Sequence, residues 1–204
     1  MIKIINYGLG NVQAFLNVYK RLGIPASPAA TVAELDGASH VILPGVGSFD
    51  HAMTLFNASG FRETLEKRLS QNDIRLLGVC VGMQMLAENS EEGSMSGLGW
   101  IKGTVRKFDT TSGDNLARLP HMGWNDVASD GKNPLFDGLH GTSRFYFLHS
   151  YFFDAAEPEN VLATTEYGPT FHSAVGSGAV YGVQFHPEKS HHWGQAFLNN
   201  FVRQ

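Results

Sequence analysis

Residues 74–86 have the sequence IRLLGVCVGMQML, in which an apolar run passes through a cysteine flanked by glycines into a helix-like pattern. The run up to Val79 predicts a buried strand, and the spacing of Met83 and Leu86 predicts a helix that begins at Cys80. A strand, a sharp turn and a helix form the setting in which many α/β enzymes expose a nucleophile. Amides at the start of the helix would favour the thiolate form of this cysteine. A buried, unreactive cysteine is the alternative that this segment alone leaves open.

Strand and helix patterns alternate through the first half of the chain. They lie at residues 2–5 (strand), 12–19 (helix), 41–43 (strand, stopped by Pro44 and Gly45) and 61–69 (helix). The second half is richer in strands, which we expect at residues 101–108, 144–151, 161–165 and 179–185, before a final helix at 192–202. Alternation of strand and helix implies a parallel sheet with helices on both faces. We therefore predict an α/β fold, a mostly parallel doubly wound sheet flanked by helices with an additional strand-rich C-terminal half, in a single domain of residues 1–204.

The composition narrows the class of protein. Of the 204 residues 43% are hydrophobic and 17% charged, with a net charge of -4, so no basic excess points to nucleic acid or to a membrane surface. A single cysteine excludes an intrachain disulfide. The first six residues, MIKIIN, turn polar too soon for a signal peptide, and no apolar run approaches the length of a membrane span. We expect a cytoplasmic protein.

A second chemical motif is GVQFHPE at residues 182–188. If the strand continues to its end, His186 and Glu188 lie two residues apart and point to the same side. A cysteine nucleophile needs such a pair, a base and an acid that orients it. An unimportant surface ion pair is the alternative. Sites in doubly wound sheets lie outside the carboxyl ends of the strands, where Cys80 would also be.

A third motif is PGVGSF at residues 44–49, just past a predicted strand. Two glycines one residue apart leave backbone N–H groups free to stabilise the negative oxygen of a tetrahedral intermediate. The complete phosphate-binding loop, with its lysine, is missing. A plain tight turn is the alternative for this segment.

The motifs GVCVGMQ (78–84) and QFHPE (184–188) resemble those of the class I glutamine amidotransferases. Other segments resemble the branch that serves imidazole glycerol phosphate synthase in histidine biosynthesis: YGLGN (7–11), PGVGSF (44–49), PHMGWN (120–125), FYFLHSY (145–151) and EKS (188–190). The resemblance extends from residue 4 to residue 201 and implies a flavodoxin-like sheet. Residues 191–193, HHW, are bulkier than expected there, and Val81 stands where leucine is more usual.

The resemblance implies a role for each catalytic residue. Cys80 would attack the glutamine side-chain amide and form a thioester, His186 would carry the proton to the departing ammonia, and Glu188 would hold His186. The oxyanion donors would come from Gly45, Val46, Gly47 and Val81, and the substrate-binding groups from Gln84, His149, Ser150 and Tyr151. Neither a metal nor an organic cofactor is expected, and no Cys/His cluster has the spacing of a zinc site.

The ammonia acceptor is expected on another polypeptide, because the glutaminase pattern fills this chain. The resemblance implies a heterodimer with the (β/α)8-barrel cyclase subunit of imidazole glycerol phosphate synthase, which makes imidazole glycerol phosphate and an aminoimidazole carboxamide ribotide. Asn11, Trp124, Tyr146 and Lys189 match positions that face this partner. Core packing or simple solvent exposure is the alternative for each of them.

Three other functions remain open from the sequence. The glutaminase subunit of pyridoxal phosphate synthase would carry a glutamate-bearing glycine loop at 44–49 and would lack the motif at 120–125. A stand-alone cysteine hydrolase on a related fold would act on a substrate other than glutamine. A binding module without activity is disfavoured by the intact Cys80, His186 and Glu188. Turnover of free glutamine, with and without the cyclase, distinguishes these functions.

Overall fold

A sheet of twelve strands runs through the computed structural model, which describes residues 1–109, 118–139 and 143–204. Its first part is parallel, in the order β2-β1-β3-β4-β12. These strands are β1 (Ile2–Ile5), β2 (Ala26–Ala29), β3 (His40–Gly45), β4 (Arg75–Cys80) and β12 (Val180–Val183). The apolar residues of β1, β3 and β4 are buried, as expected for strands covered on both faces. The order places the first strand inside the sheet, as in other doubly wound folds.

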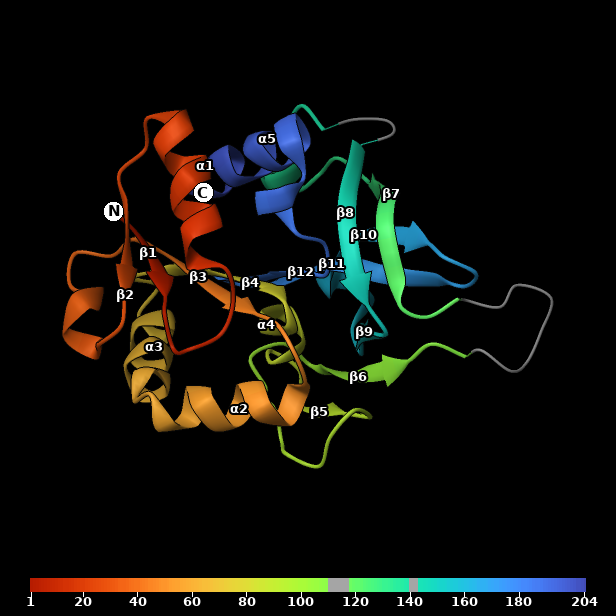
Figure 1. The fold of residues 1–204 in the computed structure, drawn as a ribbon, viewed down its shortest axis with the longest axis horizontal. Coiled ribbons are helices and arrows are strands. Elements are labelled where there is room, and N and C mark those ends of the chain that lie inside the picture. Colours follow the sequence, from red (N-terminus) through yellow and green to blue (C-terminus); the bar gives the residue numbers. More distant parts are fainter. Residues whose placement is uncertain (110–117, 140–142) are drawn as a thin grey trace.

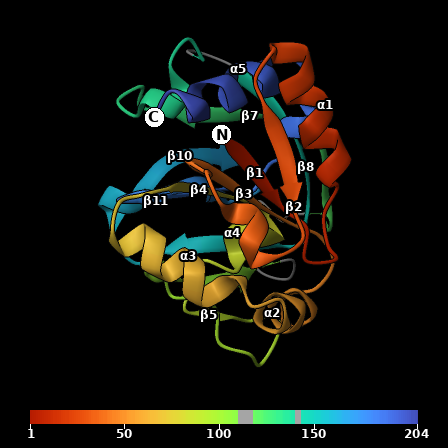
Figure 2. The same ribbon diagram turned by 90° about the vertical axis from the view of Figure 1, so that its left-hand side faces the viewer.

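Helices cover both faces of this parallel part (Figures 1 and 2). On one face lie α1 (Val12–Leu22) and α5 (His191–Val202), and on the other lie α2 (Phe49–Ala58) and α3 (Phe61–Ser70). The helix α4 (Val81–Gln84) follows β4 without a connecting loop. Short 3-10 turns lie at η1 (Val32–Leu35), η2 (Pro134–Phe136), η3 (Pro158–Asn160) and η4 (Pro187–Lys189). The predicted α/β architecture is therefore confirmed.

The C-terminal half extends the sheet with antiparallel strands. From β12 the order continues through β11 (Thr170–Ser177), β10 (Val161–Glu166), β7 (His121–Ser129) and β8 (Ser143–His149). A branch holds β9 (Tyr151–Ala155), β6 (Gly103–Lys107) and β5 (Asn89–Ser90). This confirms the strand-rich second half, and it places β8 and β9 close to the end of β4 (Figure 1).

Three elements differ from the sequence prediction in extent. The helix after Cys80 ends at Gln84, because the carbonyls of Met85 and Leu86 accept amides from Leu98 and Ile101 instead of continuing the helix. The strand expected at 144–151 is two strands, since β8 pairs with β7 whereas β9 pairs with β6 and β11. The strand expected at 179–185 ends at Val183.

The strand β3 continues through Pro44 and Gly45, where the sequence predicted a stop. Its pairing with β1 ends at Ile42, so the missing N–H of Pro44 removes no bond to that neighbour, while pairing with β4 goes on to Gly45. The sequence prediction also omitted four strands and a helix, β2, β5, β7, β11 and α2.

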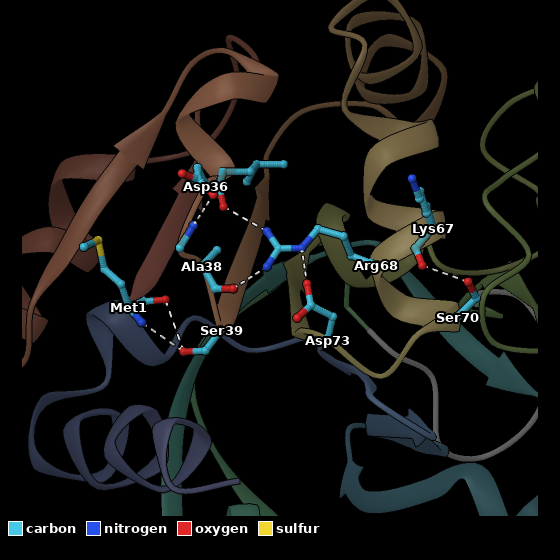
Figure 3. A network of polar contacts seen from close by, with 10 residues as sticks. Met1, Asp36, Ala38, Ser39, Lys67, Arg68, Ser70 and Asp73 are labelled. Atoms are coloured by element: carbon cyan, nitrogen blue, oxygen red, sulfur yellow. Dashed lines mark hydrogen bonds and ion pairs between the residues drawn. The ribbon is translucent and has the colours of Figure 1, made fainter.

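Arg68 fastens the end of α3 to the segment before β3, at the amino edge of the parallel strands (Figure 3). Its guanidinium donates to the backbone carbonyls of Leu35 and Ala38, the first at 2.8 Å, and forms an ion pair with Asp73 at 2.6 Å. The amino group of Met1 donates to Ser39 in the same region, at 3.0 Å. One planar cation thus joins three acceptors at the edge of the sheet opposite to Cys80.

Replacing Arg68 by lysine is expected to lower the free energy of unfolding by about 1–3 kcal/mol, because an ammonium group cannot reach all three acceptors and leaves carbonyls unpaired. Urea denaturation measures the change. The control is Arg62→Lys, which alters only exposed contacts, the ion pair with Glu66 and a hydrogen bond to Asn57, and should change the free energy by less than about 1 kcal/mol. Equal effects of the two substitutions would contradict this role of Arg68.

Candidate active site

Cys80 occupies a sharp turn between β4 and α4, with a φ of +56° and a ψ of -115°. A positive φ is rare for a residue other than glycine and is strained unless its surroundings hold it. The two flanking glycines provide the necessary space. A Cβ on Gly82 would lie 2.0 Å from the carbonyl oxygen of Leu43, and one on Gly78 would lie 2.5 Å from that of Gly82. The turn is therefore packed directly against the backbone of β3, and the sulfur is presented at the carboxyl edge of the sheet.

His186 and Glu188 lie side by side, but not because the chain is extended. They fall at the start of the 3-10 turn η4, beyond the end of β12. Nδ1 of His186 and Oε1 of Glu188 are 2.8 Å apart, and the two side chains are only 4% and 3% exposed. The backbone of His186 is held by Tyr146, whose carbonyl accepts its amide at 2.8 Å, and by Ser190, which donates to its carbonyl. The pair is thus fixed and shielded from water.

The pKa of His186 is raised to about 10. Burial alone lowers it, but hydrogen bonds to Cys80 and Glu188 and the negative charge of both groups outweigh burial. Oε2 of Glu188 is buried without a hydrogen-bond partner in the described part of the chain, so the described partner of this carboxylate is the imidazole. The arrangement can remove a proton from the thiol and hold it on His186.

A pocket of about 320 Å³ opens beside the sulfur. Its lining includes the following residues singled out in the sequence: Val46, Gly47, Cys80, Val81, Gln84, His149, Ser150, Tyr151, His186 and Lys189. Pro120, Leu148 and Glu92 complete it. A larger hollow of about 910 Å³ lies between η1 and α3 at the opposite edge, but neither cysteine nor histidine lines it. The groups that could act as nucleophile and base therefore line the smaller pocket.

The sequence profile of the family "Glutamine amidotransferase class-I" matches residues 4–204. The chain belongs to the class-I glutamine amidotransferases. Among similar proteins, "Imidazole glycerol phosphate synthase subunit HisH" of Bdellovibrio bacteriovorus is 55% identical over 98% of both chains. The protein of the same name from Leptospira borgpetersenii is 48% identical over 99% of both. A solved structure described as a glutamine amidotransferase has the same fold, with a TM-score of 0.75 at 22% identity over 99% of this chain and 100% of its own.

The glycine loop of this amidotransferase has two glycines with different roles. Gly45 pairs with Cys80 in the sheet, and a Cβ there would lie 2.4 Å from the amide nitrogen of Gly82. Gly47 has a φ of +88° with open space around it. Val46 and Gly47 line the pocket whereas Gly45 packs below it, so only the first two of these expected oxyanion residues reach the pocket from this loop. The hydroxyl of Tyr7 donates to the Pro44 carbonyl at 2.9 Å and fixes where the loop begins.

Gln84 and Glu92 bring polar groups to the pocket. Nε2 of Gln84 donates to the Tyr151 carbonyl and to Oε1 of Gln184, both at 3.0 Å, which leaves Oε1 of Gln84 to face a substrate. The sequence analysis did not identify Glu92, because its neighbourhood, Glu91-Glu92-Gly93, looks like an ordinary solvated loop. Its carboxylate accepts the amide of Phe49 at 2.9 Å at the start of α2, and this contact brings it to the pocket.

Of the residues expected to face a partner, Lys189 lines the same pocket, and the others lie on the elements around it. Trp124 pairs with Tyr146 across β7 and β8, and the ammonium of Lys189 lies 5.7 Å from the centre of the Tyr146 ring. Asn11 caps α1 and lines a small cavity together with Lys189. His191, in the segment that departs from the family pattern, stacks on Trp124 with the rings 5.1 Å apart and 6° from parallel.

Two further apolar side chains were missed in the sequence. Met122 is 65% exposed and Leu148 39% exposed, and they form the next cross-strand pair beside Trp124 and Tyr146. Together these four side chains make an apolar surface at the rim of the pocket. Within the described residues there is no group of three or more His, Cys, Asp or Glu that could hold a metal ion. No helix in the described ranges is long and apolar enough to cross a membrane.

The Glu188→Gln substitution is expected to lower the pKa of His186 by at least about one unit, or about 1.4 kcal/mol, because it removes the negative charge that offsets burial. The imidazolium would then lose its proton at a lower pH than in the unmodified chain. Titration by 15N NMR of histidine-labelled protein measures this, with the exposed Glu159→Gln as the control. Identical titrations of His186 in the two variants would contradict the assigned cause.

Proposed function

We propose that this chain is the glutaminase subunit of an imidazole glycerol phosphate synthase, which hydrolyses L-glutamine to glutamate and ammonia. The observation that carries the proposal is that Cys80 and His186 line one pocket and that Glu188 forms a buried pair with His186. The names of the full-length relatives support the synthase assignment. The high sequence identity to these relatives does not favour the two alternatives, the glutaminase subunit of pyridoxal phosphate synthase and a stand-alone cysteine hydrolase.

In the proposed mechanism the sulfur of Cys80 attacks the side-chain carbonyl carbon of glutamine while the thiol proton passes to Nε2 of His186. Glu188 accepts a hydrogen bond from Nδ1 and stabilises the imidazolium. Amides of Val81 and of the Val46–Gly47 segment stabilise the tetrahedral oxyanion. The C–N bond then breaks, and His186 returns its proton to the departing ammonia. Water, deprotonated by His186, hydrolyses the thioester and releases glutamate.

The pocket supplies groups for the other end of glutamine. An α-ammonium group needs acceptors, and the carboxylate of Glu92 and Oε1 of Gln84 are the candidates we propose. An α-carboxylate needs N–H donors, and the backbone of Ser150 and Tyr151 is proposed to provide them. The volume of the pocket, about 320 Å³, suits one amino acid.

The proposed partner is the (β/α)8-barrel cyclase subunit, which would receive the ammonia directly. The apolar surface of Met122, Trp124, Tyr146 and Leu148 borders the pocket, and an exposed surface of this kind marks a protein interface. Docking there would cover the pocket and keep the ammonia from escaping into solvent.

In the complex with the cyclase, Cys80→Ala is expected to abolish synthesis from glutamine and to leave synthesis from added ammonium salts unchanged. The cyclase reaction needs ammonia, not the thiol. Product formation with each nitrogen source measures both activities in one preparation. Residual glutamine hydrolysis by the Cys80→Ala variant would refute the nucleophile assignment.

The cyclase is expected to activate glutamine hydrolysis, because a free glutaminase would waste ammonia. The proposed switch is the peptide next to Gly47, whose positive φ and open surroundings allow it to turn an amide toward the oxyanion. One oxyanion donor is worth about 10²–10³ in turnover, so one peptide could supply most of the activation. Glutamate production is measured for the chain alone, with cyclase, and with cyclase plus its nucleotide substrate. Full activity of the chain alone would contradict this.

The variant Gly47→Val tests the switch, since a β-branched residue there would restrict the peptide while assembly stays intact. Gly178→Val is the matched control, because Gly178 also has a positive φ and open space but lies in the remote turn between β11 and β12. Gly45 is unsuitable for this test, since any Cβ there would meet the backbone of Gly82. If the cyclase activates both variants equally, the switch does not lie at Gly47 and must be another element.

A further inference from the structure

Five polar side chains, four of them buried and Asn125 half-buried, form a continuous hydrogen-bonded chain that ends at the Cys80 sulfur. In order they are Asn125, His121, His149, Gln84 and Gln184, with the carbonyl of Tyr151 between the last histidine and the first glutamine. Gln184 is fully buried, and its Nε2 lies 3.7 Å from Sγ of Cys80. The proposed mechanism assigns no role to Asn125, His121 or Gln184, although all three lie in motifs that the sequence singled out.

The Tyr151 carbonyl determines the direction of every bond in this chain. A carbonyl oxygen only accepts, so both groups that contact it must donate. His149 therefore carries its proton on Nδ1, 2.8 Å away, and Gln84 turns its Nε2 toward the same oxygen at 3.0 Å. These two donor assignments then determine which atoms donate and which accept in the hydrogen bonds on either side of the carbonyl.

Toward the sulfur, the second hydrogen on Nε2 of Gln84 is donated to Gln184 at 3.0 Å. The acceptor atom of Gln184 must then be Oε1, and its amide nitrogen must face Cys80. The reverse orientation of Gln184 would set two N–H groups against each other and present an oxygen to the sulfur. The chain thus excludes the orientation that would repel a thiolate.

Away from the sulfur, Nε2 of His149 is left without a proton and accepts from Nδ1 of His121 at 2.9 Å. Nε2 of His121 in turn accepts from Nδ2 of Asn125 at 3.3 Å. The amide of Asn125 is fixed independently, because Nδ2 donates to the Glu166 carbonyl and Oδ1 accepts the Asp126 amide, both at 2.8 Å. The Tyr151 carbonyl and the Asn125 amide therefore require the same direction of hydrogen bonding through the two histidines. Burial supports neutral rings, since it lowers the pKa of His121 to about 4 and that of His149 to about 3.

We infer that Gln184 is a further catalytic residue, which donates a hydrogen bond to the Cys80 sulfur, and that Gln84 is the positioning residue that fixes its direction. His149, His121 and Asn125 hold the same Tyr151 carbonyl from the other side. Besides His186 and Gln184, the sulfur contacts the Leu148 carbonyl at 3.8 Å, which can accept from the thiol but would repel a thiolate. When the proton leaves for His186, the Gln184 donor remains and stabilises the negative sulfur. This inference rests on the proposed glutaminase function, because Gln184 is a catalytic residue only if Cys80 is the nucleophile that attacks glutamine.

The proton positions are tested first in the unmodified chain by 15N NMR of labelled histidine. Both His121 and His149 should carry the proton on Nδ1, with Nε2 unprotonated. A proton on Nε2 of either ring would overturn the inference. This measurement needs no variant and no glutamine turnover.

The contact with sulfur is tested by the rate at which iodoacetamide alkylates Cys80 at neutral pH. Gln184→Met keeps a similar shape but has no donor, and it should slow alkylation about 10- to 100-fold, the range expected for losing a hydrogen bond to a charged atom. The control is Gln13→Met, an exposed glutamine on α1 that bonds only within its helix, and it should react at the unmodified rate. Equal rates for both variants would overturn the inference.

The direction of the chain is tested by two substitutions at Asn125. Asn125→Asp presents an acceptor to Nε2 of His121, which should place a proton on that nitrogen, while His149 keeps its Nδ1 proton because the Tyr151 carbonyl still accepts it, and alkylation should proceed at the unmodified rate. Asn125→Ala removes the end group without reversing it and should keep both Nδ1 protons. Indistinguishable NMR signatures for the two variants would contradict the directional chain. If these results hold but glutamine is not hydrolysed with the cyclase, the proposed function fails while the hydrogen-bond assignment stands.

Discussion

The site depends on a close approach of two backbone segments, the turn at Cys80 and the end of β3. Gly45, Gly78 and Gly82 meet neighbouring backbone so closely that a Cβ at any of them would lie within 2.5 Å of another atom. This contact holds Cys80 in a positive-φ conformation and directs its sulfur out of the sheet. It also sets the Val46–Gly47 segment beside the sulfur, where a donor for an oxyanion is needed. The proposed nucleophile and the proposed oxyanion donors are therefore positioned by one piece of backbone packing.

The two edges of the parallel sheet have different roles: contacts that stabilise the fold lie at the amino edge, and the residues of the candidate site lie at the carboxyl edge. At the amino edge Arg68 and Met1 tie helix and strand ends together with ordinary polar contacts. At the carboxyl edge the polar groups are buried and strongly coupled, so that burial lowers the pKa of His121 and His149 while hydrogen-bonded partners raise that of His186. Neutral imidazoles suit a fixed hydrogen-bond chain, and an imidazole that holds its proton suits acid–base work. The antiparallel half supplies most of these groups, which explains why the domain needs it.

The sequence predicted the parallel core, which the structure confirms, from apolar runs. It also predicted that Cys80, His186 and Glu188 lie together, from the glycines around Cys80 and the spacing of His186 and Glu188, and their catalytic role stays a proposal. Strand β2, with sequence ASPA, and β7, which alternates between buried and exposed residues over nine positions, lack an apolar run and were missed. The contacts of Gln184 with Gln84 and Cys80, and that of His121 with His149, join residues 28 to 104 positions apart, so nothing in the local sequence reveals them. Glu92 reaches the pocket only through the start of α2, a helix that the sequence prediction omitted.

The central claim is that Cys80 forms a covalent γ-glutamyl thioester from free glutamine. The most direct measurement is mass spectrometry of peptides from the chain mixed with cyclase and glutamine, quenched in acid during turnover. The account predicts a glutamyl adduct on the peptide that contains Cys80, and it predicts that the adduct disappears when glutamine is exhausted. Turnover without any adduct on Cys80, or with the adduct on a different residue, would contradict the account.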